Sequence, residues 1–272
     1  DNLPAAALRK VGAGQTAPGA WLCLDPVRWH VESAGVTLDD PARLMLSAAE
    51  SAALIEAVQP LFADWGELSA SAPGCWELQL KQEIALETQP LPTAIHQAID
   101  PHLPGGGAGP AWRLRLAEAQ MLLHAHPVNR QREAEGKPAV NSLWPWGQGS
   151  LPETVRASHE AVWSTDPVVA GLCVHAGVPC RAPPGRFEPA SGRVLAIIET
   201  LATPARTLEA LAWRDALQAF ERDWLTPALT ALKRGECKEL RLIGTRLGGT
   251  PATLALALSR GALLRFWRKP RP

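Results

Sequence analysis

The sequence predicts an α/β protein with a mixed, partly parallel sheet and helices on both faces, together with an α+β cap-like subdomain. Two patterns carry this prediction. Up to Gly149, short apolar strands and a hairpin are interspersed with amphipathic helices. Beyond it, apolar strand-like runs alternate with helical ones, as in strand–helix–strand units of a parallel sheet. We therefore expect an α+β cap-like region over 1–152 and an α/β core region over 153–272, which could pack as one domain.

The first half opens with short strands, followed by a helix with a clear start signal. Ser47 and Glu50 have the capping-box spacing, in which each side chain satisfies a free backbone N–H of the first turn. The apolar face of this helix continues at helical period until Gly66 ends it. The predicted strands are 21–24, 27–31 and 36–38, and the predicted hairpin joins 67–72 to 76–80.

Two further helices are predicted before the middle of the chain. One spans 112–123 and stops before Pro127, which cannot continue a helix. A short one follows over 129–135, capped by Asn129 and ended by Gly136. In the second half we expect buried strands over 168–175 and 194–200, a long helix over 207–232 bent at Pro227, a strand over 239–244, a short helix over 251–258 and a last strand over 262–267.

The composition excludes several classes of protein. Lys and Arg number 27, as do Asp and Glu, and this balance argues against a nucleic-acid partner. The apolar runs are far shorter than the roughly 20 residues of a membrane-spanning helix, so we expect no membrane partner. The five cysteines include no C-x-x-C pair, which favours free thiols in the reducing cytoplasm over disulfides or a zinc site.

The segment from His124 to Gly149 reads HAHPVNRQREAEGKPAVNSLWPWGQG and is the candidate functional site. It combines imidazoles, amides and guanidinium groups with two tryptophans and a glycine turn, a set suited to binding a small anion. The alternative is structural: Pro127 ends one helix, Asn129 caps the next and the tryptophans fill a core. The predicted ligand-binding residues are His124, His126, Asn129, Arg130, Arg132, Asn141, Trp144, Trp146, Gly147 and Gly149.

This segment resembles the archaeal-type cofactor-independent phosphoglycerate mutases of the alkaline-phosphatase superfamily. Residues 116–129, LAEAQMLLHAHPVN, are similar in particular to a bacterial branch of phosphoglycerate-mutase-like, or RpfE-type, regulatory proteins. The resemblance is specific over 116–149 and looser elsewhere. It places the family's arginine at Arg132 and leaves Arg130 as an extra basic residue, so either can face a ligand.

The resemblance also implies a reaction that this chain lacks the residues to perform. Such mutases transfer a phosphoryl group with a Ser or Thr nucleophile and two divalent metals held by Asp and His. The segments after the two corresponding strands, 201–206 and 245–250, contain neither Asp nor His, and no His follows His175. Hard or borderline cations need carboxylate or imidazole ligands. We therefore expect a catalytically degenerate relative with no cofactor, which binds a small phosphorylated or carboxylate metabolite in a regulatory role.

Two other functions stay open from the sequence. In the first, the chain is an active mutase or phosphatase using Mn²⁺ or Mg²⁺, with its nucleophile and some ligands upstream of Asp1. In the second, the Trp-rich segment is a docking surface for a protein partner. Two histidine–aspartate groups are conceivable metal sites. His159, Asp166 and His175 have irregular spacing, which favours ordinary surface or strand positions. His96, Asp100 and His102 have i, i+4 and i+6 spacing, but Pro101 breaks the helical geometry that this spacing would need.

Overall fold

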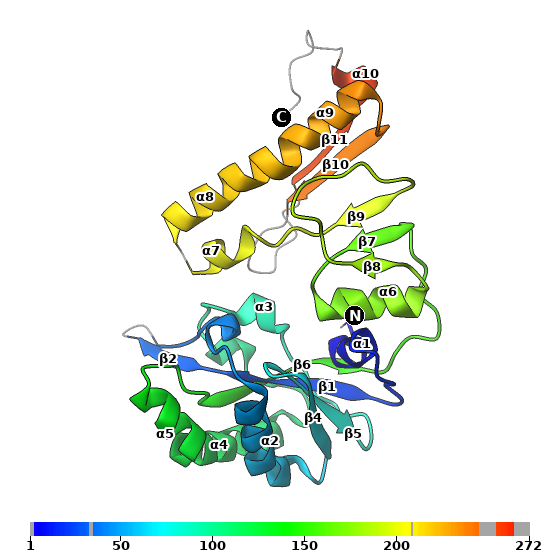
Figure 1. Ribbon diagram of the computed structural model, residues 1–272. Coiled ribbons are helices and arrows are strands. Elements are labelled where there is room, and N and C mark those ends of the chain that lie inside the picture. The colour runs from blue at the N-terminus through cyan, green and yellow to red at the C-terminus, as the bar shows by residue number, and fades with distance from the viewer. Residues whose placement is uncertain (1–2, 33–34, 208, 245–253, 264–272) are drawn as a thin grey trace. The chain divides into compact units, whose positions relative to one another are not determined.

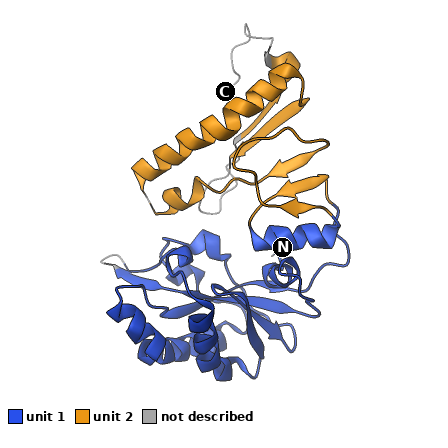
Figure 2. Ribbon diagram, in the orientation of Figure 1, with its two compact units in different colours: residues 1–156, 166–177 blue, residues 157–165, 178–272 orange. Residues whose placement is uncertain are grey.

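The computed structural model describes residues 3–32, 35–207, 209–244 and 254–263, and the chain divides into two compact units (Figure 2). The first unit comprises Asp1–Arg156 and Asp166–Gly177, and the second comprises Ala157–Thr165 and Val178–Pro272. The sequence placed a single boundary at 152/153. The chain instead enters the second unit after residue 156, returns to the first for residues 166–177 and then leaves it again.

The first unit is an α+β body around a four-stranded antiparallel sheet in the order β4-β5-β1-β6. A separate two-stranded hairpin pairs β2 with β3. Its strands are β1 (Trp21–Val27), β2 (Trp29–Glu32), β3 (Gly35–Leu38), β4 (Gly66–Ala72), β5 (Cys75–Leu80) and β6 (Ser142–Gly149). Its helices are α1 (Ala5–Gly12), η1 (Pro41–Arg43), α2 (Ala48–Phe62), α3 (Leu91–Ala94), η2 (Asp100–His102), α4 (Gly109–Ala125), α5 (Pro127–Ala134) and α6 (Pro167–Ala176).

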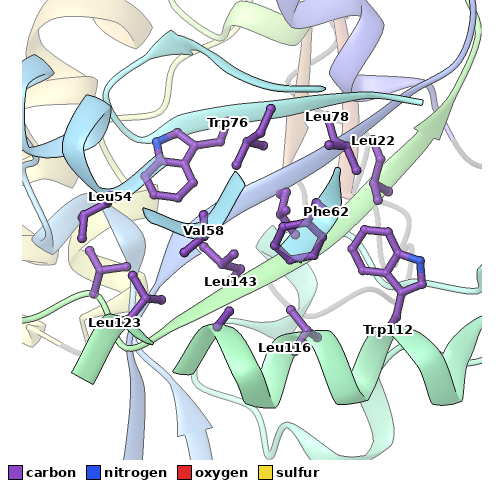
Figure 3. Packing of buried hydrophobic residues seen from close by; sticks show 14 of the residues in the cluster. Leu22, Leu54, Val58, Phe62, Trp76, Leu78, Trp112, Leu116, Leu123 and Leu143 are labelled. Carbon is purple, nitrogen blue, oxygen red and sulfur yellow. The ribbon is translucent and has the colours of Figure 1, made fainter. Parts of the chain in front are cut away.

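Helices cover both faces of this sheet. On one face, α2 and α4 pack over an apolar core that includes Trp76, Trp112 and Phe62 (Figures 1 and 3). On the other face α1 packs against β1 and β6, and α6 packs against α1. Every residue of β1 is buried as a result. Because side chains alternate along a strand, the two faces of β1 belong to two different layers of the unit.

The second unit contains a three-stranded parallel sheet in the order β8-β7-β9 and an antiparallel hairpin of β10 and β11. Trp224 packs edge-on against Trp163 of the parallel sheet, with ring centroids 6.3 Å apart. Its strands are β7 (Ala161–Trp163), β8 (Cys180–Arg181), β9 (Val194–Ala196), β10 (Glu239–Gly244) and β11 (Leu254–Ser259). Its helices are α7 (Ala202–Arg206), α8 (Ala210–Phe220), the π-helical turn η3 (Glu221–Leu225), α9 (Thr226–Arg234) and α10 (Arg260–Leu263).

The predicted α/β class is confirmed, including a parallel sheet, although the strands divide between separate sheets. The predicted capping box at α2 is also confirmed, because Ser47 and Glu50 each accept a hydrogen bond from the other's backbone N–H. Gly66 does not end this helix, which stops at Phe62. It begins β4, where a side chain would collide with the carbonyl of Gln79. No described helix is both long enough and apolar enough to cross a membrane.

The predicted strand over 168–175 was wrong, because this segment is the helix α6. The Asp166 carboxylate accepts hydrogen bonds from the backbone N–H groups of Val168 and Val169, Pro167 occupies the first turn, and Gly177 ends the helix with a φ of 66°. These are strong helix boundary signals. The run of valines suggested a strand, but the end signals decide the structure.

The C-terminal predictions were also partly wrong. The helix predicted over 251–258 was wrong from residue 254 onward, because residues 254–259 form β11, whose alternating Leu and Ala pair with β10 over six residues, and residues 251–253 lie outside the described range. The predicted strand over 262–267 begins as α10, and its residues from 264 onward lie outside the described range. The long helix predicted over 207–232 is α8, η3 and α9. The π-helical turn precedes Pro227, whose ring nitrogen cannot donate a hydrogen bond to the preceding turn.

Candidate functional site

The motif segment, His124–Gly149, begins where α4 ends and α5 begins. Nδ1 of His126 accepts a hydrogen bond from the backbone N–H of Val128 at 3.2 Å, so His126 caps α5. The predicted cap at Asn129 was therefore wrong by one turn. Pro127 takes the first position of α5, where a missing N–H costs nothing. His126 is half-buried, and His124 is exposed on the last turn of α4.

Asn129 is buried and joins three pieces of backbone. Its side-chain amide donates hydrogen bonds to the carbonyls of Leu123 and Val140, each at 2.7 Å, and its oxygen accepts one from the N–H of Val140 at 2.9 Å. These contacts tie the end of α4 to the segment that leads into β6. A ligand would reach Asn129 only by displacing them.

Arg132 is 1% exposed and bonds to three separate parts of the first unit. Its Nε donates to the carbonyl of Pro138 at 2.9 Å, one terminal nitrogen donates to Glu50 Oε1 at 2.7 Å, and the other donates to the carbonyl of Leu44. Burial raises the pKa of Glu50, but hydrogen bonds from the Ser47 backbone and from Arg132 outweigh it and lower the pKa to about 2. Arg132 thus lies in the framework, facing away from solvent.

The second half of the motif segment also forms internal contacts. The Asn141 side chain both donates to and accepts from the backbone of Trp29, at 2.9 and 2.7 Å. The indole N–H of Trp144 donates to the carbonyl of Gln89 at 3.0 Å, and that of Trp146 donates to Asp25 Oδ2 at 2.7 Å. Both indoles therefore pack and bond inside the first unit.

The two glycines of the motif permit a helix to approach. Gly147 has a φ of 61°, and a Cβ built there would lie 2.7 Å from Cβ of Ala5 in α1. At Gly149, with a φ of 152°, it would lie 3.0 Å from Cβ of Pro4. The close approach that the sequence assigned to a ligand is made in this structure by the start of α1.

Two of the ten predicted site residues, His124 and Arg130, are exposed. Beside α5 lies a groove of about 320 Å³, lined by Met45, Ser47, Glu50, Val128, Gln131, Glu135 and Lys137. Lys137 pairs with Glu135 at 2.6 Å, so the groove presents two carboxylates and one lysine. Its charge does not suit an anion. The exposed guanidinium of Arg130 suits one better.

A second polar group, which the sequence analysis missed, lies between α1 and the sheet. We name Arg9, Lys10, Asp25 and Glu77 the charged cluster, and all four are at most 8% exposed. Asp25 accepts hydrogen bonds from Arg9 at 2.7 and 2.9 Å, from the backbone N–H of Trp76 at 3.1 Å and from the Trp146 indole. The signal in the sequence was a carboxylate within each of two apolar strands.

Glu77 is less well compensated than Asp25. It accepts two hydrogen bonds from Ser71, at 3.0 Å from the backbone and 2.7 Å from the hydroxyl. The ammonium of Lys10 stands 4.0 Å away and donates instead to the hydroxyl of Ser69 at 2.7 Å. Burial raises the pKa of Glu77 to about 7 despite the opposing Ser71 hydrogen bonds and nearby cations. Burial likewise raises the pKa of the neighbouring Cys75 thiol to about 11.

The two histidine–aspartate groups do not assemble into metal sites. Asp166 caps α6, His175 contacts the carbonyl of Pro152 at 2.6 Å, and His159 contacts Ser158 at 3.1 Å. Within the described ranges, no three His, Cys, Asp or Glu side chains are grouped to hold a metal ion.

Comparison with known proteins gives matches over part of the chain. No protein-family model matches. A stretch of 105 residues, 36% of this chain, is 35% identical to a 2,3-bisphosphoglycerate-independent phosphoglycerate mutase of Methanosarcina barkeri and covers 26% of that protein. A stretch covering 29% of this chain is 39% identical to the mutase of Methanothrix thermoacetophila, over 21% of its length. The chain is related to these mutases over about a third of its length. It spans about a quarter of theirs.

A solved structure also aligns with part of this chain. The cofactor-independent phosphoglycerate mutase from Thermoplasma acidophilum aligns with 79% of this chain and 64% of its own, at 13% identity and a TM-score of 0.41. In this chain, Asn129 and Arg132 of the motif segment point inward and form hydrogen bonds within the first unit.

Proposed function

We propose that this mutase-related chain is a catalytically degenerate protein that binds a small phosphorylated or carboxylate ligand in a regulatory role. Residues 201–206 and 245–250, where the resemblance places metal ligands, contain no Asp or His. A two-metal phosphoryl transfer needs such ligands. The RpfE-type assignment is part of the same proposal. We also place the protein in the cytoplasm, since its five cysteines are all free thiols.

One observation carries the proposal: Asn129 and Arg132, the most distinctive polar residues of the motif, form only internal contacts. A sequence motif can be shared because it builds the same local structure, without the same reaction. Similarity to the mutases is then explained by a common folded unit. This leaves the exposed edge of the motif segment free to bind a ligand.

We place the anion at the start of α5, between His124, His126 and Arg130. His126 caps α5 through its Nδ1, and Arg130 follows in the first turn of that helix. The positive end of the helix dipole adds to the charge of the Arg130 guanidinium. Arg130 is exposed, and its side chain forms no hydrogen bond or ion pair with the described part of the chain. Its guanidinium remains available for a carboxylate or phosphate.

The experiment measures the melting temperature of the protein with and without phosphoglycerate. We expect phosphoglycerate to raise the melting temperature of the wild type and of Arg43→Ala, an exposed control in η1, but not of Arg130→Ala. A mutase assay supplemented with Mn²⁺ completes the test. Turnover would overturn the degenerate assignment, and an equal shift in Arg130→Ala would overturn the proposed binding edge.

A further inference from the structure

The two carboxylates of the charged cluster differ in how they are held. Asp25 accepts four hydrogen bonds, two of them from the Arg9 guanidinium. Glu77 is completely buried, yet it accepts hydrogen bonds from one serine, and its nearest cation stands 4.0 Å away, bonded to Ser69. A buried carboxylate is stable in its charged form when ion pairs and hydrogen bonds replace water. Asp25 meets that condition and Glu77 does not.

The cover over Glu77 is α1, which supplies both cations of the cluster. Leu8, Arg9 and Lys10 of α1 are all buried. Above them α6 packs closely, since a side chain at Gly171 would collide with the carbonyl of Leu8. Movement of α1 away from the sheet would therefore expose Glu77 to water. The protonation of this carboxyl and the position of α1 are linked by the geometry.

We propose that Glu77 is a proton-dependent switch that sets how tightly α1 is held against the sheet of the first unit. While Glu77 is protonated, its burial beneath α1 costs little. When Glu77 loses its proton, the charged group gains hydration if α1 opens. Rising pH through neutrality therefore loosens α1, and falling pH tightens it. This switch is separate from the ligand site at α5 and does not depend on it.

The direction of this pH dependence follows from the charged groups that face Glu77. Lys10 and Arg9 of α1 lower its pKa, Asp25 of β1 raises it, and burial raises it more than the cations lower it, to about 7. The remaining titratable groups nearby are the thiols of Cys23 and Cys75, both with raised pKa values, and Asp166, which acts on Cys75. With α1 open, the pKa of Glu77 returns toward its ordinary value of 4.5. Between pH 4.5 and about pH 7, Glu77 is therefore protonated while α1 is closed and ionised when α1 is open. Opening releases a proton, so rising pH favours the open state.

Hydrogen exchange of the α1 amides tests this switch in the intact protein. The opening equilibrium of α1 is expected to rise about 10- to 50-fold between about pH 5 and about pH 7.5 in the wild type, which follows from the difference between the two pKa values. In Glu77→Gln it should stay nearly constant, because the amide has no proton to lose. Glu67→Gln, an exposed carboxyl on the neighbouring strand β4, is the matched control and should behave as the wild type. Intrinsic exchange rates cancel when variants are compared at one pH.

Lys10→Met separates a switch from a merely structural role of Glu77. Removing the cation 4.0 Å from Glu77 removes an interaction that lowers its pKa, so the pH midpoint of α1 opening should move upward. An unchanged or lower midpoint would overturn the proposal. The same pH dependence of opening in Glu77→Gln and the wild type would also overturn it.

Discussion

The first unit carries 11 Lys and Arg against 18 Asp and Glu, whereas the second carries 16 against 9, although the whole chain is neutral. The units differ in packing as well. The first has two apolar cores, one on each face of its sheet. Large apolar side chains are exposed in both units, for example Met45 and Met121 in the first and Leu211 and Ile243 in the second. The contrast in packing is therefore that both apolar clusters, and most of the described buried apolar side chains, belong to the first unit.

Because the two units have opposite net charges, the net charge of the whole chain describes neither of them. The prediction that the protein binds no nucleic acid was drawn from its zero net charge, and it stays a prediction. A neutral total here combines an acidic unit with a basic one. Long-range steering depends on where the charge lies. Because both apolar cores lie in the first unit, substitutions that break buried contacts there should cost far more stability than surface changes in the second.

The largest expected effect is that of Arg132→Ala in the first unit. It leaves the carbonyls of Leu44 and Pro138 without their donor and removes the partner of Glu50. Breaking a buried pair from one side costs about 3–5 kcal/mol. Urea unfolding measures this cost. Arg214→Ala, which removes an exposed pair with Asp215 in α8, is the control and should cost less than about 1 kcal/mol. Equal losses of stability in Arg132→Ala and Arg214→Ala would contradict the contrast between the two units.

The second largest expected effect is a dependence of stability on pH that arises from two carboxyl groups of the first unit. The pKa of folded Glu77, about 7, lies above its ordinary value of 4.5, so stability falls as pH rises between them, by up to about 3 kcal/mol. The pKa of Glu50 is lowered to about 2, so its contribution is lost as pH falls from 4.5 to 2. Stability should therefore peak near pH 4.5. Urea unfolding at a series of pH values measures the peak, and a Glu77→Gln variant without the neutral-side loss would confirm its source.

A smaller effect is expected at the contact between α1 and α6. Gly171→Ala places a methyl group against the carbonyl of Leu8, so the two helices must separate. Overpacking of this kind costs about 1–3 kcal/mol. Gly14→Ala also introduces a methyl group, into open space near the end of α1, and its cost reflects backbone strain at a φ of 76°. Thermal unfolding of Gly171→Ala without any loss of stability would show that the helices do not pack this closely.

The smallest effect is expected on the exposed surface of the second unit. Leu211 is 69% exposed, so Leu211→Ser should change the free energy of unfolding by less than about 0.5 kcal/mol. Differential scanning calorimetry measures this. A much larger loss would indicate that α8 is covered in solution, and the contrast between the units would then need revision.

Local signals predicted much of the first unit. The Ser47–Glu50 capping box, the hairpin of β4 and β5 and the helix α4 all depend on neighbouring residues, and each was found. The helix α6 was missed although Asp166 and Gly177 mark its ends, because its valines outweighed these signals. The alternation of Leu and Ala in β11 was overlooked in the same way.

The roles of the motif residues could not be predicted from their neighbours in the sequence. Arg132 bonds to Glu50, 82 residues earlier, and Trp146 bonds to Asp25, 121 residues earlier. An arginine or a tryptophan indole suits a ligand and a buried partner equally well. Which one it meets is decided by the tertiary fold. The sequence thus identified the segment correctly as unusual, but the direction of its side chains required the structure.

The most direct test compares two arginines of the motif segment by one measurement, the melting temperature with and without phosphoglycerate. Arg132→Lys should lower the melting temperature of the free protein and leave the ligand-induced rise intact, since its role is structural. Arg130→Ala should leave the free protein unchanged and lose the rise. The reverse pattern, with ligand binding lost at Arg132 and stability unchanged, would contradict the account.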